Sequence, residues 1–197
     1  SLYSIKVEIA DAESSEPEVP SGPLEEVEVS LFEETFDEGY ESKTAYNGKT
    51  GAWSYTDGSA NLSRNSDGGE GKIYAARNQA SAMQFKFDDG QEYTDVMKLK
   101  VTADILTGPT DKDSCRVDVI GSIESDGHHR VTLCSLSGGK FYVNTTGTAA
   151  ARDTGATYEA ATRYIVEGII DEANKTFTVS IYEKDTGDVV LENYNVT

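Results

Sequence analysis

Residues 46–78 combine aromatic rings with polar side chains in a way that suits the binding of sugars. A pyranose ring has apolar C–H faces that stack on aromatic rings, while its hydroxyl groups hydrogen-bond to amide, carboxylate and guanidinium groups. This stretch supplies both kinds of group: Trp53, Tyr55 and Tyr74, together with Arg64, Arg77 and Asn78. The only tryptophan, Trp53, is the first candidate for a stacking platform. The alternative is that Trp53 is a core residue beneath a long loop, with Tyr55 on the same strand face buried beside it.

Acidic residues near turns offer oxygen ligands for a structural calcium ion. Ca²⁺ binds carboxylate and carbonyl oxygens, and Glu33, Glu34 and Asp171 are the candidate ligands. No EF-hand loop orders these residues. The alternative is that they lie in solvated turns, because Asp is common in turns for backbone reasons.

No catalytic residue is assigned. His128 and His129 are adjacent in the sequence, and adjacent side chains on a strand face opposite ways, which favours an exposed turn over a dyad. The sequence has no nucleophile elbow, zinc-protease helix or phosphate-binding loop. A glycosidase needs two carboxylates beside a cleft. Because the chain has 35 acidic residues, a glycosidase remains an alternative, but no two of these residues stand out as its carboxylate pair.

The two cysteines, Cys115 and Cys134, lie in consecutive strand patterns separated by a turn signal at residues 125–127. If Ser122 faces Gly127 across the turn, antiparallel register places Cys115 directly opposite Cys134. Such a pair is close enough for a disulfide when it is not hydrogen-bonded. The alternative is two buried free thiols, which behave as small apolar groups.

The charge balance excludes two classes of partner. The formal net charge is −18, from 35 acidic and 17 basic residues. Nucleic acids and anionic membrane surfaces are bound through clustered Lys and Arg, so neither is expected here. The sequence also lacks an apolar run long enough for a transmembrane helix. A strongly acidic surface is typical of a protein kept soluble by self-repulsion.

Alternation of apolar and polar residues dominates the chain and predicts an all-β protein. Phe177, Val179 and Ile181 alternate with Thr and Ser, as in a strand with one buried face. About a dozen such patterns with turn signals between them predict an antiparallel two-sheet β-sandwich, a jelly roll of the concanavalin A-like kind, with very little helix. Only residues 148–152 and 158–161 resemble short helices.

The domain organisation follows from a change in composition near the N-terminus. Residues 1–10 contain a strand that is either the tail of an upstream module or part of the main sheet. Residues 11–25 are acidic and rich in Pro and Ser, which predicts a linker. Residues 26–197 form the predicted β-sandwich domain.

Several segments together resemble a known group of modules. They are Leu31-Phe-Glu-Glu-Thr-Phe-Asp37, Gly51-Ala-Trp-Ser-Tyr55, Gly69-Glu-Gly-Lys-Ile-Tyr74, and the closing pair Tyr164-Ile-Val-Glu-Gly-Ile-Ile-Asp171 and Lys175-Thr-Phe-Thr-Val-Ser-Ile-Tyr182. Their layout resembles the jelly-roll, lectin-like accessory modules of bacterial enzymes that degrade plant cell walls, including those associated with pectate lyases. The resemblance covers about residues 30–197. It implies a secreted or cell-surface protein that binds polysaccharide, often with a structural calcium ion, and that shares its chain with an upstream catalytic or binding module.

We therefore expect a non-catalytic carbohydrate-binding module for a plant-cell-wall or other extracellular polysaccharide. Two alternatives remain: a structural or adhesive spacer in a multi-modular secreted protein, and a small polysaccharide lyase or hydrolase. Binding predicts that Trp53, Tyr55 or Tyr74 lines an open groove, whereas the spacer predicts that all three are buried.

Overall fold

The strands of this chain form an antiparallel β-sandwich, as the alternating patterns predict. The computed structural model describes residues 1–10, 29–56, 62–75, 82–91, 93, 96–112, 115–124, 127–145 and 151–196. Within these residues the only helix is a 3₁₀ turn at Tyr40–Ser42, and no helix is long and apolar enough to cross a membrane. The prediction of an all-β protein with very little helix is confirmed.

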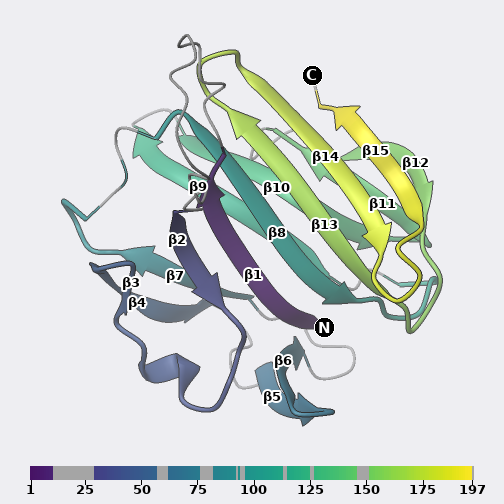
Figure 1. Cartoon of the computed structure of the whole chain (residues 1–197), viewed down its shortest axis with the longest axis horizontal. Helices are drawn as coiled ribbons and strands as arrows, with labels where there is room; N and C mark the ends of the chain where they lie inside the picture. Colours follow the sequence, from purple (N-terminus) through teal and green to yellow (C-terminus); the bar gives the residue numbers. More distant parts are fainter. Residues whose placement is uncertain are drawn as a thin grey trace, which may run out of the picture.

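The larger sheet contains eight strands and faces the viewer in Figure 1. Its order is β15-β14-β13-β8-β1-β6-β5, with β2 also paired to β1. The strands are β15 (Val189–Asn195), β14 (Thr176–Glu183), β13 (Arg163–Asp171), β8 (Lys98–Leu106), β1 (Leu2–Ile9), β6 (Glu70–Ala75), β5 (Leu62–Asp67) and β2 (Ser30–Glu34).

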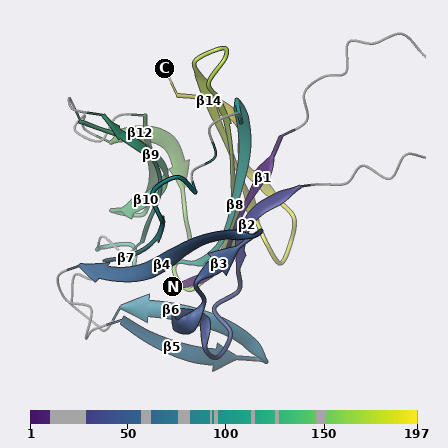
Figure 2. The same ribbon diagram turned by 90° about the vertical axis from the view of Figure 1, so that its left-hand side faces the viewer.

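Two smaller sheets complete the architecture. A four-stranded sheet has the order β12-β11-β10-β9, and a three-stranded sheet has the order β3-β4-β7. Figure 2 shows β9, β10 and β12 facing β1, β8 and β14 across the sandwich, with β3 and β4 at its lower end. The strands are β9 (Arg116–Glu124), β10 (Gly127–Ser137), β11 (Lys140–Asn144), β12 (Arg152–Thr157), β3 (Ala45–Tyr46), β4 (Lys49–Thr56) and β7 (Ala82–Phe87).

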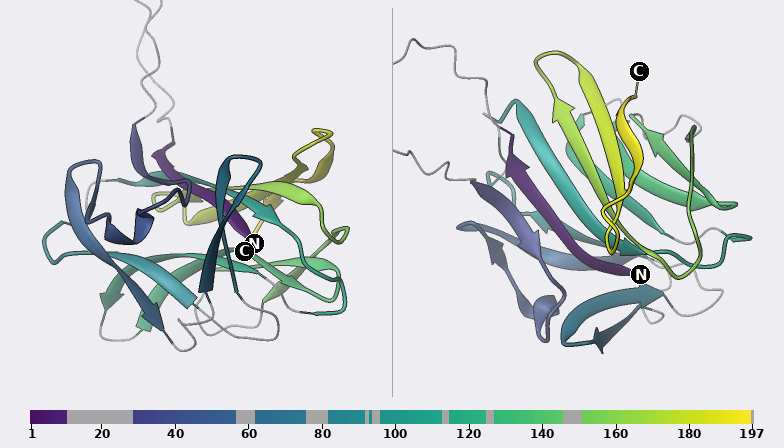
Figure 3. Two further views of the ribbon diagram at one scale, coloured as in Figure 1. Left: turned by 90° about the horizontal axis from the view of Figure 1, so that it is seen from below. Right: turned by 45° about the vertical axis from the view of Figure 1, so that its right-hand side comes forward.

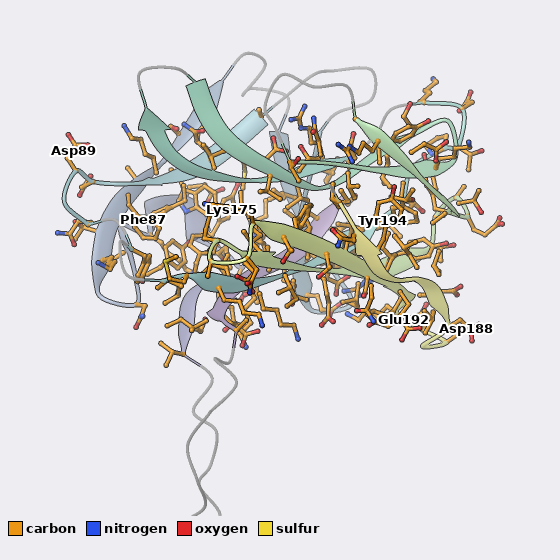
Figure 4. All side chains as sticks on the ribbon, turned by 90° about the horizontal axis from the view of Figure 1, so that it is seen from above. Phe87, Asp89, Lys175, Asp188, Glu192 and Tyr194 are labelled. Atoms are coloured by element: carbon orange, nitrogen blue, oxygen red, sulfur yellow. The ribbon has the colours of Figure 1, made fainter. Side chains whose placement is uncertain are left out.

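The main core lies between the larger sheet and the four-stranded sheet. Because successive strand residues point to opposite faces, β13 alternates between buried and half-buried positions along its whole length. Val166 on β13 and Val179 on β14 face Leu133 on β10 and Phe141 on β11 in one apolar cluster. Figure 4 shows side chains filling the space between the two layers, with Tyr194 beside that space and Asp188 and Glu192 at the outer side of the larger sheet.

The N-terminal strand is an internal part of the larger sheet. Every residue of β1 from Ser4 to Ile9 is paired with β8, and the other edge of β1 pairs with β2. The right-hand panel of Figure 3 shows β1, in purple, between its neighbours. Residues 2–9 therefore belong to the same sandwich as the strands that follow. The predicted linker, residues 11–25, lies outside the described residues.

The short predicted helices are not formed where the structure describes them. Residues 158–161 form a turn between β12 and β13, with Ala161 at a positive φ of 56°. Of the other segment, Ala151 is not helical and Arg152 begins β12, while residues 148–150 lie outside the described residues. Four or five residues are too few to form a helix without tertiary support.

The expected pairing of the two cysteines is wrong by two residues. In the structure Cys134 lies opposite Val117, and Cys115 lies across from Leu136, whose N–H donates to the Cys115 carbonyl (2.9 Å). The pairing of β9 with β10 starts at Glu124 and Gly127 and contains two β-bulges, which together set this register. A two-residue offset keeps both cysteines on the core face but makes them diagonal neighbours, about 7–8 Å apart between Cα atoms. That separation is too long for a disulfide, and both cysteines are free thiols.

This arrangement predicts that Ellman titration of the denatured, unreduced protein finds two thiols per chain. In the native protein, burial raises the pKa of both thiols, and Cys134 has no exposed surface, so its reaction should wait for unfolding. A denatured, unreduced sample with no reactive thiol would show that a bridge forms and that Cys134 does not lie opposite Val117.

Candidate functional site

Trp53 lies within an aromatic cluster and not on an open platform. Its half-buried ring lies 5.5–6.4 Å from the rings of five neighbours, mostly in edge-to-face contacts. These five neighbours are Phe32, Phe36, Tyr40, Tyr46 and Phe85. Edge-to-face geometry is the arrangement that aromatic quadrupoles favour in protein interiors. The Trp53 Nε1–H donates to the Tyr46 hydroxyl (3.2 Å), so both the polar and the apolar parts of the indole are engaged in packing.

The aromatic cluster adjoins the buried carboxylate of Glu34, to which Tyr46 is hydrogen-bonded. Glu34 has no exposed surface, and its oxygens accept hydrogen bonds from the backbone N–H groups of Thr35 (2.9 Å) and Phe36 (2.8 Å). The Lys43 ammonium donates to both oxygens (2.8 and 3.0 Å), and the Tyr46 hydroxyl donates to one. Burial and this hydrogen bond to Glu34 raise the pKa of Tyr46 above its usual range. A buried carboxylate with four donor groups, one of which is the paired Lys43 ammonium, is fully satisfied.

The calcium ligands expected from the sequence are not brought together. Glu34 is engaged with Lys43, and the adjacent Glu33 is exposed on the strand position opposite Lys6. Asp171 ends β13, where its carboxylate accepts the backbone N–H and the side-chain amide of Asn174 (both 2.9 Å). These bonds hold the turn and lower the pKa of Asp171. In the described parts of the chain no group of three His, Cys, Asp or Glu side chains is placed to hold a metal ion.

The other expected sugar-binding residues do not converge on one surface. Tyr55 on β4 and Tyr74 on β6 are exposed (39% and 38%). Arg64 pairs with the buried Ile73 and so lies on the opposite face of β5–β6 from Tyr74. Its Nε–H donates to the Phe36 carbonyl (3.0 Å). Arg77 and Asn78 lie outside the described residues.

Arg64 instead helps to hold a strained segment at the start of the domain. Phe36 is fully buried and has a positive φ of 54°, which a bulky residue rarely adopts. Its N–H donates to Glu34 and its carbonyl accepts from Arg64, so neighbouring groups fix this conformation from both sides. Gly71 on β6 completes the contact, because a Cβ atom there would lie 2.2 Å from the Phe36 carbonyl oxygen.

Removal of the Trp53 ring should therefore lower stability. We expect Trp53→Ala to cost about 3 kcal/mol, as for a large ring deleted from a packed cluster, and to lower the Tm by roughly 6–12 °C. Tyr55 hydrogen-bonds to Tyr40 of the same cluster, so the control is Tyr74→Ala on β6, at an exposed tyrosine, which should cost less than about 1 kcal/mol. Thermal unfolding followed by circular dichroism measures both. Equal Tm values for Trp53→Ala and the parent protein would contradict the packing role.

A second surface, missed from the sequence, lies on the outer face of the four-stranded sheet. The strand register places two rows of side chains across this face, because directly paired residues share a face. One row is Asp118, Thr132 and Asn144; the other is Arg116, Ser135, Tyr142 and Asp153. We call these seven residues the polar platform.

A β-bulge in β10 creates the polar platform. Between the Thr132–Asn144 pair and the Ser135–Tyr142 pair, β10 carries one residue more than β11. Leu133 and Cys134 consequently both lie in the core, although they are consecutive. Thr132 and Ser135 can then both point outward, three positions apart. Without the bulge, strict alternation would turn one of them into the core.

Hydrogen bonds fix the polar groups at the centre of the platform. Arg116 Nε–H donates to Asp118 Oδ1 (2.9 Å), and Arg116 Nη2–H donates to Thr132 Oγ1 (3.2 Å). The Thr132 hydroxyl donates in turn to Asp118 Oδ1 (2.8 Å). Charge-assisted hydrogen bonds of this kind are stronger than neutral ones and restrict the side chains to one arrangement. The guanidinium of Arg116 remains half exposed at the surface.

An aromatic ring lies beside these polar groups. Tyr142 on β11 is half buried on the outer face, directly opposite the small Ser135 on β10 and Asp153 on β12. Lys140, two residues earlier on β11, donates to Asp153 Oδ2 (2.6 Å) at the edge of the platform. On β9, Ile120 continues the outer face with an exposed apolar side chain. The platform thus offers a ring, a serine hydroxyl, carboxylates and a guanidinium on one sheet face. Thr132 and Asn144 are buried beneath these groups (2% and 6% exposed) and support them.

The sequence contained a signal for part of this surface. Arg116 and Asp118 are two residues apart on a strand, as are Tyr142 and Asn144, so each pair necessarily shares a face. The sequence does not reveal that the two pairs belong to the same sheet. Nor does it reveal that the strand between them carries Thr132 and Ser135. That juxtaposition depends on long-range register and on the bulge.

Comparisons of the chain with protein-family models, with curated proteins and with solved structures find no significant match.

Proposed function

We propose that the protein is a non-catalytic carbohydrate-binding module and that its polar platform is the binding surface. The observation that carries the proposal is the position of Tyr142 beside the half-exposed guanidinium of Arg116 on the outer face of the four-stranded sheet. Asp118 and the buried Thr132 hold that guanidinium in place. A sugar presents an apolar ring face and a rim of hydroxyl groups, which these two kinds of side chain complement.

The position of the platform on a sheet face favours an extended polysaccharide over a small ligand. The seven side chains come from four neighbouring strands, which lie about 4.8 Å apart, a spacing comparable with the length of one pyranose residue. Ordinary small-molecule sites are concave and enclose most of their ligand. A sheet face with ordered polar groups instead offers repeated contacts along a chain of sugars.

The arrangement supports binding more than catalysis. A hydrolase needs one carboxylic acid and one carboxylate on either side of the scissile bond. On the platform, Asp118 is held by Arg116 and Thr132, and Asp153 by Lys140 and the backbone N–H of Gly155. The pKa of Asp153 is lowered, first by the hydrogen bond from Lys140, which is the opposite of what a general acid requires.

The proposal predicts that Tyr142→Ala weakens polysaccharide binding by about 30-fold or more, equivalent to ~2 kcal/mol, the cost of truncating a central aromatic contact. Its Tm should fall only slightly, because the ring lies outside the main core. Affinity electrophoresis against soluble xylan, mannan, β-glucan and pectin measures the binding. Tyr74→Ala, which removes an exposed tyrosine from β6, is the matched control and should bind like the parent protein.

Three results would count against this assignment. Equal binding by Tyr142→Ala and the parent protein would move the site away from the platform. A loss of binding in Tyr55→Ala alone would place the site on β4. Absence of binding to every polysaccharide would favour the structural spacer. The packing of Trp53 agrees with that role, whereas the exposure of Tyr55 and Tyr74 does not.

A further inference from the structure

Four side chains of the polar platform form a row that crosses the four-stranded sheet at right angles to its strands. The register pairs Arg116 on β9 with Ser135 on β10, Ser135 with Tyr142 on β11, and Tyr142 with Asp153 on β12. Directly paired residues share a face, so all four side chains point outward. Arg116 and Asp153 are exposed at the two ends of this cross-strand row, and Ser135 and Tyr142 are half buried between them.

The surface beside Tyr142 along its own strand is less accessible. Asn144, two residues further along β11, is 6% exposed, and Thr132, with which Asn144 pairs, is 2% exposed. In the other direction one outward residue, Lys140, remains before β11 begins. A ligand laid along β11 would therefore leave the accessible surface soon after Tyr142, whereas a ligand laid across the strands meets accessible side chains from β9 to β12.

The length of the cross-strand row corresponds to a short stretch of polysaccharide. Its four side chains are separated by three inter-strand spacings of about 4.8 Å, or about 14 Å in all. Because one spacing is comparable with the length of one pyranose residue, the row can contact about three consecutive sugars. One sugar would lie on the Tyr142 ring, one between Ser135 and Arg116, and one beside Asp153.

The polar groups at both ends of the row are held in place and keep hydrogen-bonding capacity. A guanidinium has five N–H donors, and the described contacts of Arg116 use two of them, at Nε and Nη2. Each oxygen of Asp153 accepts one bond, from Lys140 (2.6 Å) and from the Gly155 N–H (2.8 Å), although a carboxylate can accept about four. Side chains that are already fixed lose little conformational entropy when a ligand binds.

From this geometry we propose that the polysaccharide lies across the strands and that the site recognises a stretch of at least three sugars in a linear chain. Tyr142 would provide the stacking contact, and Arg116 and Asp153 would be the specificity-determining residues at the two ends. This inference rests on the proposed function. Dependence of binding on both Arg116 and Asp153, which lie on the first and last strands of the sheet, is the signature of a ligand in this direction.

The proposal predicts that Arg116→Ala affects long ligands more than short ones. Affinity for a tetrasaccharide, which spans the row, should fall about tenfold, the size of one charge-assisted hydrogen bond. A disaccharide can bind over Tyr142 with either neighbouring position, so removal of one position should lower its affinity by no more than about twofold. Asp153→Ala should give the same pattern from the other end of the row.

The experiment is isothermal titration calorimetry with the di-, tri-, tetra- and hexasaccharides of the polymer that retards the parent protein most. Parent affinity should rise by about tenfold or more from the disaccharide to the tetrasaccharide and change little beyond it. The matched controls are Lys175→Ala and Glu192→Ala, which remove exposed charges of the same signs from the larger sheet, where Figure 4 labels both residues. They should bind like the parent protein, and thermal unfolding verifies that each variant is folded.

The results distinguish the cross-strand row from the proposed function as a whole. Equal affinity of the parent protein for di- and tetrasaccharides would overturn the row and leave carbohydrate binding intact. Equal losses for both ligands in Arg116→Ala, or equal losses in Arg116→Ala and Lys175→Ala, would also overturn it. If Arg116→Ala does not fold, Asp153→Ala decides from the exposed β12 end. Failure of the parent protein to bind any polymer would overturn the proposed function itself.

Discussion

The one-sided burial of strands in a two-layer sandwich is the constraint on which the rest of this structure depends. Every strand that crosses the main core must turn alternate side chains inward, so the residues facing solvent are fixed by the residues facing the core. A β-bulge in β10 interrupts this alternation. Leu133 and Cys134 both enter the core, and the parity of the strand changes at that point. The outward positions of Thr132 and Ser135, and with them the polar platform, are consequences of how the core is filled.

A different arrangement is found at the aromatic cluster, where a buried carboxylate lies beside a second, smaller apolar core of Phe36, Tyr40 and Ile73. The Glu34 side chain gathers two backbone N–H groups, the Lys43 ammonium and the Tyr46 hydroxyl, and Tyr46 in turn accepts from Trp53. Removal of any one donor would leave part of a buried charge uncompensated, which is costly. The rings around this carboxylate are structural for that reason, even where they are partly exposed.

The two regions illustrate why composition is a poor guide to a binding surface. The segment with the highest aromatic content packs on itself, with its tryptophan edge-on to its neighbours. The proposed binding surface has a single tyrosine and draws its polar groups from four strands that are consecutive in the sequence and adjacent in the sheet. Ion pairs fix the side chains of Arg116 and Lys140 on this surface.

A related link joins the β5–β6 hairpin to the larger sheet. Arg163 on β13 pairs with Asp104 on β8 and with Glu70 on β6, and its guanidinium lies over the ring of Tyr3 (3.7 Å to the centroid). Lys184 on β14 adds a second cation to Asp104 (2.6 Å). Asp104 is almost fully buried, so this pairing compensates its charge and fastens four strands together.

The sequence by itself determined the strand content and the layering of this protein. Alternation in residues such as Phe177, Val179 and Ile181 is a local property, and it placed each of them correctly in the core. Local pattern also showed that Arg116 shares a face with Asp118. The tertiary structure alone decided the rest: whether Trp53 is packed or open, which residues satisfy Glu34, and which residue faces Cys134. Those outcomes depend on long-range register, and a single bulge shifts the pairing of every residue that follows it, which alternation within one strand does not reveal.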